Sequence, residues 1–423
     1  MWKVLPNGLT VVVQPASSAA VVALQMWVKV GSADELEPER GLAHVHEHML
    51  FMGTGRRGLG EIAAAVEAAG GEINAWTSYD STVYHLVLGA RFFAQGLDIL
   101  ADALLDSSFE EGALASELEV VLDEIRQTRD MPAHVVSEQL FQLAYGQHPY
   151  RHPIIGRVAT VETFTRPQVL DFYRRWYVPE NMVLVVVGDV DPTQALRAIE
   201  GTFGGAPARP IVRPPRPVEP PPSGMRVSIA RDRIAEAHLL LGFPVPGLLH
   251  PDVPALNLLA VILGQGDAAR LPREVRRRKA VATGVHAYAY TPSDPGLFVV
   301  GATTPPEKVE AAFQALLEEL FRLQHELVTP AELARARRIL EMEVIYQKET
   351  VEGAARKLGF FQTVAGDLGF EQRFHEAVAR VTPAQLQEVA RRTFARSRLS
   401  AALLLPAPAE GTTRAVGGDG APP

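Results

Sequence analysis

The sequence predicts an α+β protein of two similar domains, each an antiparallel-rich sheet layered with helices. A chain of 423 residues is too long for one ordinary core and suits two domains of about 200 residues each. Eight prolines lie between Pro207 and Pro222, and this extended segment divides the chain in two. The same order of predicted strands and helices recurs on both sides, which indicates a diverged internal duplication.

In the first half, continuous or alternating apolar residues predict the strands, and a period near 3.6 residues predicts the helices. The expected strands are residues 9–14, residues 21–30, two short strands within residues 73–88, and residues 182–188. The expected helices are one that follows residue 41 and ends near the glycines at 53 and 55, then 59–69, 92–106, 116–126, 133–145, 165–177 and 192–203.

The second half repeats this order of elements. Its expected strands are residues 226–229, 237–243, 285–289, 297–303 and 399–405. Its expected helices are residues 254–263, 273–279, 307–323, 330–346, 352–365 and 383–394. We therefore expect a first domain at 1–206, a linker at 207–223, a second domain at 224–407, and a disordered tail rich in Gly, Ala and Pro at 408–423.

Charge and composition narrow the possible functions. A formal net charge of −8 argues against a nucleic-acid-binding surface. The absence of cysteine excludes disulfides and thiolate zinc sites, which leaves His and carboxylate side chains as metal ligands. No apolar run approaches the ~20 residues that cross a bilayer. The first residues show no secretory leader, so we expect a cytoplasmic protein, or a periplasmic one if a leader has been removed.

The helix that follows residue 41 carries the motif His44-Val45-His46-Glu47-His48. At about 100° per residue, His44, Glu47 and His48 fall within one sector of the helix. Two neutral imidazoles four residues apart can share one Zn²⁺, and the carboxylate beside them can accept a proton from water. The order His-x-x-Glu-His is the inverzincin signature, although a motif this short also occurs by chance.

A catalytic zinc usually takes three protein ligands, so another segment should supply an acid. The best source is the predicted helix at residues 116–126. Glu117 and Glu124 are seven residues apart and share one helix face, whereas Glu119 and Asp123 point elsewhere and are expected to be solvated.

Together these residues resemble the pitrilysin and mitochondrial processing peptidase family of zinc metallopeptidases, in its two-domain bacterial form. Glu124 follows His48 by 76 residues, and the resemblance covers nearly the whole chain. Further matching segments are residues 5–9, 74–77, 148–150, 154–156 and 176–182.

The resemblance implies a processing-peptidase-like metallohydrolase fold in which the two domains form a clam-like shell around a Zn²⁺ site. It assigns the zinc ligands to His44, His48 and Glu124, the general base to Glu47, and a supporting catalytic role to Glu117. The implied reaction is hydrolysis of short or unfolded peptides by a zinc endopeptidase or oligopeptidase.

The resemblance also implies how a peptide binds. The strand that contains Asn74 and Ala75 is expected to align the substrate by main-chain pairing, which is β-augmentation. In the second half, residues 269–283 resemble a segment whose Arg and Tyr, seven apart, bind substrate and stabilise the tetrahedral intermediate. Arg276 matches the Arg, but Thr283 stands at the Tyr position and is too short; Tyr288 and Tyr290 are at the wrong spacing.

Intact zinc residues beside an incomplete Arg/Tyr pair predict the zinc-bearing subunit of a heterodimer, whose paralogous partner supplies that pair. The rival prediction is a homodimer. A further alternative is a non-catalytic assembly subunit, like the core proteins of respiratory complexes that resemble the same family, but such subunits characteristically lose the metal residues. We expect the other histidines near these segments to be structural: His46, His85, His148 and His152.

Overall fold

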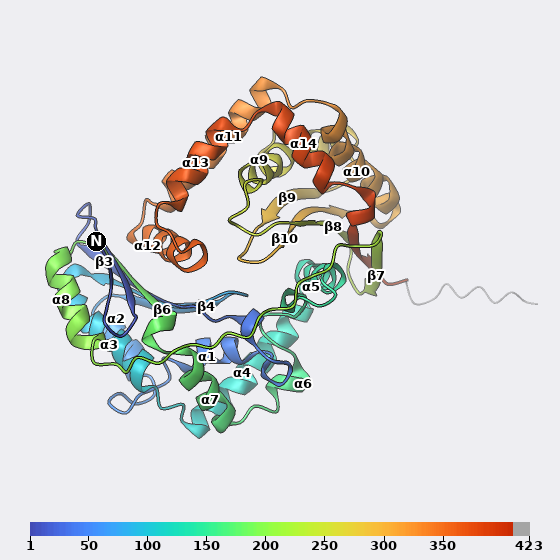
Figure 1. Cartoon of the computed structure of the whole chain (residues 1–423). Coiled ribbons are helices and arrows are strands. Elements are labelled where there is room, and N and C mark those ends of the chain that lie inside the picture. Colours follow the sequence, from blue (N-terminus) through green and yellow to red (C-terminus); the bar gives the residue numbers. More distant parts are fainter. Residues whose placement is uncertain (409–423) are drawn as a thin grey trace, which may run out of the picture.

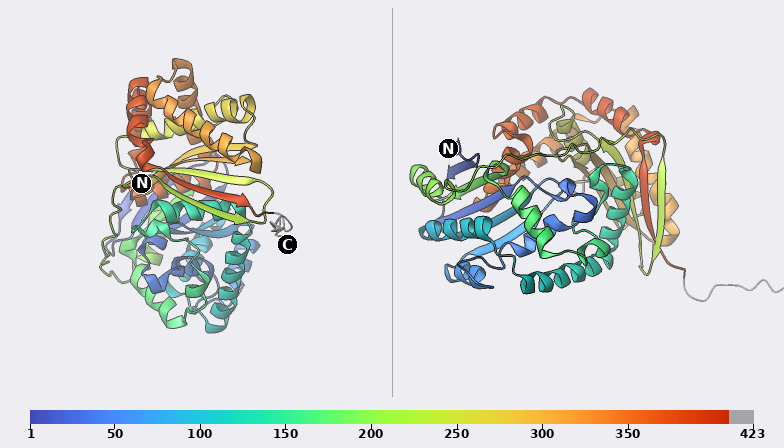
Figure 2. Two further views of the ribbon diagram at one scale, coloured as in Figure 1. Left: turned by 90° about the vertical axis from the view of Figure 1, so that its right-hand side faces the viewer. Right: turned by 60° about the horizontal axis from the view of Figure 1, so that its bottom comes forward.

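The computed structural model describes residues 1–408, so the predicted tail lies outside the described residues except for its first residue. Two sheets, one in each half, are layered with helices, which confirms the predicted α+β class (Figure 1). Figure 2 shows the blue-to-green first half below the yellow-to-red second half in its left view. In residues 1–408, no helix combines the length and apolar character needed to cross a bilayer.

The first sheet has six strands in the order β1-β2-β6-β3-β5-β4, so β4 forms one edge. Only β2 and β6 pair in parallel; the other neighbours are antiparallel. The strands are β1 (Trp2–Val4), β2 (Thr10–Pro15), β3 (Val21–Val28), β4 (Glu72–Thr77), β5 (Thr82–Gly89) and β6 (Met182–Gly188). Every residue of β6 is buried, as its continuous apolar run predicts.

The second sheet has five strands in the order β7-β11-β8-β10-β9. They are β7 (Arg226–Asp232), β8 (Ala237–Val245), β9 (Gly284–Tyr290), β10 (Gly296–Thr304) and β11 (Ser400–Pro406). Again the first and last strands of the half, β7 and β11, pair in parallel. The path first-fifth-second-fourth-third is the same for β2–β6 and β7–β11, which is the arrangement that an internal duplication produces.

The helices follow the predicted order with small shifts at their ends. In the first half they are α1 (Leu42–Met49), α2 (Glu61–Ala68), α3 (Phe93–Asp106), α4 (Glu111–Arg129), α5 (Pro132–Ala144), α6 (Val158–Val161), α7 (Arg166–Trp176) and α8 (Pro192–Phe203). In the second half they are α9 (Val253–Gly264), α10 (Val309–His325), α11 (Pro330–Gln347), α12 (Val351–Phe360), α13 (Phe370–Arg380) and α14 (Pro383–Thr393).

Four helical segments differ from the sequence prediction. The helix expected at 352–365 becomes π-helical after Phe360, in the segment η8 (Phe361–Ala365). The helix expected at 273–279 is also π-helical, in η6 (Pro272–Arg278). The short helix α6 was not predicted. Helix α13 was not predicted either, although Phe370, Phe374 and Val378 repeat every four residues along it.

The two halves exchange one helix each. Helix α5 of the first half packs on the second sheet, where Leu140 lies in an apolar cluster with Leu240, Val299 and Leu404. Helix α12 of the second half packs on the first sheet in the same way, in a cluster whose members are Val12, Ala23, Trp27, Val83, Val183, Val185, Val187, Ala354 and Ala355. Each sheet is therefore covered on its other face by helices of its own half.

Glycines allow both exchanged helices to approach closely. A Cβ built on Gly359 of α12 would lie 1.9 Å from Nε1 of Trp27 on β3. A Cβ built on Gly242 of β8 would lie 3.0 Å from Cδ1 of Leu140 on α5. The first contact is against a rigid indole ring, whereas the second is against a flexible leucine side chain.

The extended segment between α8 and β7 joins the halves through Arg216. One guanidinium nitrogen, Nη1, donates to Asp80 at 2.6 Å and to Asp294 at 2.7 Å, and Nη2 donates to Asp34 at 3.0 Å. Asp34 and Asp80 belong to the first half and Asp294 to the second. We call these four residues the Arg216 clasp.

Candidate metal centre

Helix α1 is fixed at its start by a buried carboxylate. Gly41 precedes the helix with a φ of 109°, and Glu35 accepts hydrogen bonds from the backbone N–H groups of Gly41, at 3.0 Å, and Ala43, at 2.7 Å. Burial raises the pKa of Glu35 to about 8, although these two hydrogen bonds oppose the shift. Sequence analysis did not single out Glu35, because it stands too far before the helix for an ordinary cap.

Three side chains from α1 and α4 converge on one point. Nε2 of His44 lies 3.8 Å from Oε2 of Glu124, and Nε2 of His48 lies 3.6 Å from the same oxygen. One ligand atom from each of the three residues falls within 4.8 Å of the others. Atoms that coordinate a tetrahedral Zn²⁺ at the usual bond lengths are about 3.3–3.6 Å apart, so the two distances to Glu124 are close to the spacing of a zinc site. Two imidazoles and a carboxylate are also donors that zinc accepts.

The charge state of His44 also suits a metal ligand. Its side chain is buried, and this burial together with the charge of His48 lowers the pKa of His44 to about 3. The imidazole is therefore neutral at physiological pH, which is the form that coordinates zinc. Nδ1 of His44 is buried without a hydrogen-bond partner among the described residues, so this ring is not held by the hydrogen bonds that satisfy an ordinary core histidine.

Glu117 supports the second histidine. Its Oε2 lies 3.2 Å from Nδ1 of His48, the ring nitrogen opposite the one that faces Glu124. A carboxylate in this position fixes the tautomer and the orientation of a metal-binding imidazole. Because Glu117 and Glu124 are two helical turns apart on α4, one helix supplies both the ligand and the supporting carboxylate.

Glu47 lies on α1 beside the cluster. Burial raises the pKa of its carboxyl, and the charge of Glu124 raises it further, whereas a hydrogen bond from Thr77 and the charge of His48 lower it. A carboxyl whose pKa moves toward neutrality is better matched to accept and return a proton near pH 7.

His46 lies on the opposite side of α1 and has a structural role, as predicted. It is fully buried, with Nδ1 2.7 Å from the carbonyl oxygen of Leu42 and Nε2 2.9 Å from that of Val169 on α7. Its ring packs against Phe109, Phe172 and Tyr177.

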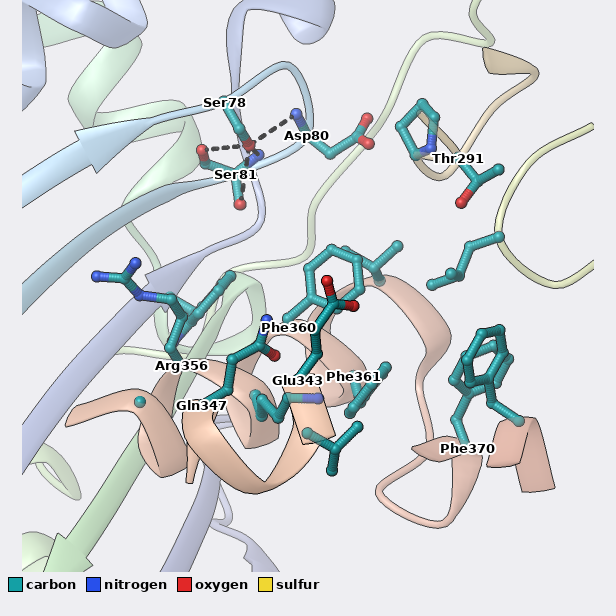
Figure 3. A pocket seen from close by; sticks show the side chains of 18 of the residues that line it. Ser78, Asp80, Ser81, Thr291, Glu343, Gln347, Arg356, Phe360, Phe361 and Phe370 are labelled. Carbon is teal, nitrogen blue, oxygen red and sulfur yellow. Dashed lines mark hydrogen bonds between the residues drawn. The ribbon is translucent and has the colours of Figure 1, made fainter. Parts of the chain in front are cut away.

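The strand predicted to bind peptide lies next to this helix. β4 is an edge strand, paired only with β5, and Thr77 at its end donates to the carbonyl oxygen of Ala43 on α1 at 3.5 Å. Asn74 and Ala75 line a cavity of about 1040 Å³ (Figure 3), and the N–H of Ala75 donates to Oδ1 of Asn74 at 2.8 Å. His85 on β5 lines the same cavity.

The residues singled out in the second half lie elsewhere. Arg276, on η6, is bonded to Asp267 at 2.7 Å, and Thr283 donates to Glu236 at 2.8 Å. Neither is among the described residues that line the cavity, whereas Tyr290 is. The structure thus brings the five residues of α1 and α4 together, places Asn74 and Ala75 on the adjacent strand, and leaves Arg276 apart from them.

A two-domain α+β frame with a His-His-Glu cluster and a neighbouring glutamate defines the class of zinc-metallopeptidase-like proteins. The family model described as Insulinase (Peptidase family M16) matches residues 10–157, and that described as Peptidase M16 inactive domain matches residues 163–340. The chain belongs to this M16 family, the pitrilysin family of peptidases.

Relatives and solved structures agree with this assignment. An uncharacterized zinc protease of Streptomyces coelicolor is 30% identical over 403 residues, which cover 93% of this chain and 86% of the relative. An uncharacterized zinc protease of Bacillus subtilis is 26% identical, with 90% and 92% covered. A protease from Helicobacter pylori matches with a TM-score of 0.92 and 26% identity, over 96% of this chain and 99% of that one.

Proposed function

We propose that this protein is a zinc-dependent endopeptidase that hydrolyses short or unfolded peptides in a chamber between its two halves. The observation that carries the proposal is the convergence of His44, His48 and Glu124 with Glu47 beside them. A protein of ordinary structural function has no need for two imidazoles and a carboxylate within reach of one ion, with a second glutamate orienting one of the rings.

The chain's own residues have distinct tasks in this reaction. His44, His48 and Glu124 would hold Zn²⁺, and Glu117 orients His48. Zinc, when bound, polarises a peptide carbonyl and promotes deprotonation of water. The Glu47 carboxylate accepts the proton of the attacking water and returns it to the nitrogen of the leaving amine.

The free edge of β4 aligns the substrate in this proposal. An extended peptide that pairs with an edge strand is held through its main chain, which positions a bond for cleavage while reading little side-chain sequence. The cavity that Asn74 and Ala75 line is bordered by residues of both halves. A site between two halves favours chains that are short or unfolded.

The proposal includes a partner subunit. Arg276 is engaged by Asp267, and Thr283 cannot reach as far as a tyrosine, so this chain lacks a complete donor pair for the tetrahedral intermediate. Donors of that kind commonly contribute about 2.7–4 kcal/mol to the transition state. We therefore propose a heterodimer in which a paralogous subunit supplies an Arg and a Tyr seven residues apart. The chain assayed alone should be at least about 10²-fold less active than the mixture, and full activity of the purified chain would favour the homodimer.

A Glu47→Gln variant tests catalysis directly. The amide cannot accept the proton, so hydrolysis of a fluorogenic peptide should fall to background while zinc content, measured by metal analysis, stays near one per chain. Glu119→Gln, an exposed change on α4, is the matched control and should retain both zinc and activity. Undiminished hydrolysis by the Glu47 variant would refute the proposal.

A further inference from the structure

The cavity beside β4 is lined by both halves of the molecule (Figure 3). The wall of the first half contains the polar turn between β4 and β5, including Ser78 and Ser81, together with Trp27 and Trp76. The other belongs to the second half and is formed by the end of α11, by α12, by η8 and by the start of α13. A peptide that pairs with the free edge of β4 lies between these walls.

The second wall contains a group of aromatic side chains, which we call the aromatic wall: Phe360, Phe361, Phe370 and Phe374. Neighbouring ring centroids are 5.5 Å apart between Phe360 and Phe361, 5.5 Å between Phe361 and Phe370, and 6.3 Å between Phe370 and Phe374. All four are half-buried and line the cavity.

Two of these rings are not used to build the fold. Phe374 packs against the core of the second half, and Phe360 packs against the cluster under α12. Phe361 and Phe370 belong to none of the apolar clusters formed by the described residues. Both rings line the cavity, and Lys357 lies over the Phe361 ring at 5.7 Å. The part of each ring that remains exposed can be covered by an entering side chain.

The two cationic side chains beside the aromatic wall are paired, whereas Glu343, which also lines the cavity, is bonded to the neutral amide of Gln265. Lys357 donates to Glu371 at 2.9 Å, and Arg356 donates to Glu352 at 2.9 Å while its guanidinium stacks over the Trp76 ring at 4.6 Å. An apolar side chain that enters can cover these rings without leaving a charge unpaired, whereas a charged one would lose hydration. The rings of the aromatic wall therefore favour an apolar side chain.

We propose that Phe361 and Phe370 form a subsite for a large apolar side chain of a peptide that extends along β4, and that substrates are extended peptides with such a residue away from the cleaved bond. The inference rests on the proposed function for its occupant. Side chains of an extended peptide alternate between two faces, so every second residue of a chain paired with β4 points to one wall. The subsite explains how a site based on main-chain pairing prefers some peptides over others.

Matched fluorogenic peptides test the subsite. Each pair is identical except for Phe or Gln at one position, and the position is moved stepwise away from the cleaved bond. The native protein, with its partner subunit if activity requires one, should cleave the Phe peptide with a kcat/KM about tenfold higher or more at the position that reaches the wall. Phe361→Ala with Phe370→Ala should reduce that ratio to below about threefold, and Phe361→Leu with Phe370→Leu should restore most of it. Phe321→Ala, which removes a half-buried ring on α10 away from the cavity, should leave the ratio unchanged.

A binding measurement separates this inference from the proposed function. Trp27 and Trp76 line the cavity, so their fluorescence reports peptide binding to the Glu47→Gln protein, in which no cleavage follows. The Phe peptide should bind about tenfold more tightly than the Gln peptide, and the double Ala variant should lose this difference. Hydrolysis with an unchanged Phe/Gln ratio in the double Ala variant would overturn the subsite and leave the peptidase intact. Phe-dependent binding to the Glu47→Gln protein, together with no hydrolysis by the native protein and its partner subunit, would support the subsite and refute the peptidase.

Discussion

The two halves of the molecule share one strand path but differ in the helix that follows β3 in the first half and β8 in the second. In the first half this helix is α1, which carries His44, Glu47 and His48. In the second half it is α9, in which ten of twelve residues are buried and none is titratable. The same frame thus supports a metal cluster in one copy and a purely apolar layer in the other.

The comparison of α1 with α9 shows which contacts hold a helix that presents polar side chains to a metal site. α9 is held by aliphatic side chains around most of its surface. α1 also packs apolar residues into the core, but directed polar contacts hold it as well. Glu35 binds its first N–H groups, and His46 reaches the carbonyl oxygen of Val169 on α7. The candidate metal cluster therefore combines two residues of α1 with one of α4, and polar contacts orient α1 in addition to its packing on the sheet.

The largest expected effect is the loss of zinc binding and hydrolysis when the candidate ligand on α4 is removed, since among the described residues only the first half carries the cluster. Glu124→Gln removes a ligand contributed by α4, so zinc affinity should fall by about 10²-fold or more, and peptide hydrolysis should fall to background. Glu341→Gln on α11, the helix at the corresponding place in the second half, should change neither quantity. Metal analysis and a peptidase assay check both variants, and full zinc occupancy in Glu124→Gln would show that the cluster is not the metal site.

A smaller loss is expected from the supporting carboxylate. Glu117→Gln leaves the three ligands in place but weakens the contact that orients His48, so zinc affinity or activity should fall by about 10–100-fold. Competition with a chelator measures the affinity. A decrease as large as that of Glu124→Gln would mean that Glu117 itself coordinates the metal.

The next prediction compares the two exchanged helices, α12 and α5, by the stability that is lost when a glycine at each contact is replaced by alanine. Gly359→Ala places a methyl group against the Trp27 ring, so we expect a loss of about 1–3 kcal/mol in the free energy of unfolding. Gly242→Ala meets the movable side chain of Leu140 and should cost less. Urea denaturation of the two variants measures the difference, and equal costs would indicate that α12 can shift away from its sheet as easily as Leu140 rotates.

The smallest effect concerns acid stability at the Arg216 clasp. A hydrogen bond from His148, together with those from Arg216, lowers the pKa of Asp294 from 3.8 to about 2, against the effect of burial. A carboxyl with a depressed folded-state pKa stabilises the protein above pH 3.8, and this contribution is lost as the pH falls toward 2. It amounts to at most about 2 kcal/mol and is reduced by solvent, because a third of the side chain is exposed.

Asp294→Asn should therefore be less stable at neutral pH and lose stability less steeply between pH 4 and pH 2. Denaturant unfolding across this pH range measures the slope. Asp189→Asn, which changes an exposed carboxylate after β6, should keep the native slope. An unchanged slope in Asp294→Asn would exclude the clasp as a source of the acid sensitivity.

Helical spacing predicted that His44, Glu47 and His48 share one face of α1, and that Glu117 and Glu124 share one face of α4. The division of these residues into zinc ligands, general base and supporting carboxylate came from the resemblance to the pitrilysin family. Strand β6 was also predicted well, because a continuous apolar run between turn residues indicates a buried strand.

Other features depend on contacts that no local pattern contains. The apolar residues of β6 require a cover on both faces, but they do not say which helix provides it, so the exchange of α5 and α12 could not be predicted. Glu35 caps α1 from outside the usual capping position. The π-helical turns shift the helical register within segments whose composition is ordinary for an α-helix. Helix α13 is different, because its apolar period was readable and was overlooked.

The exchange of α5 and α12 also has a consequence for synthesis of the chain. The last strand of the first sheet ends at Gly188, whereas the helix that covers its inner face begins at Val351. At usual rates of translation, a ribosome needs about 8–30 s to make the residues between them. Throughout that interval, one apolar face of the first sheet is exposed in the nascent chain. We expect chaperones that recognise newly made protein to bind this surface.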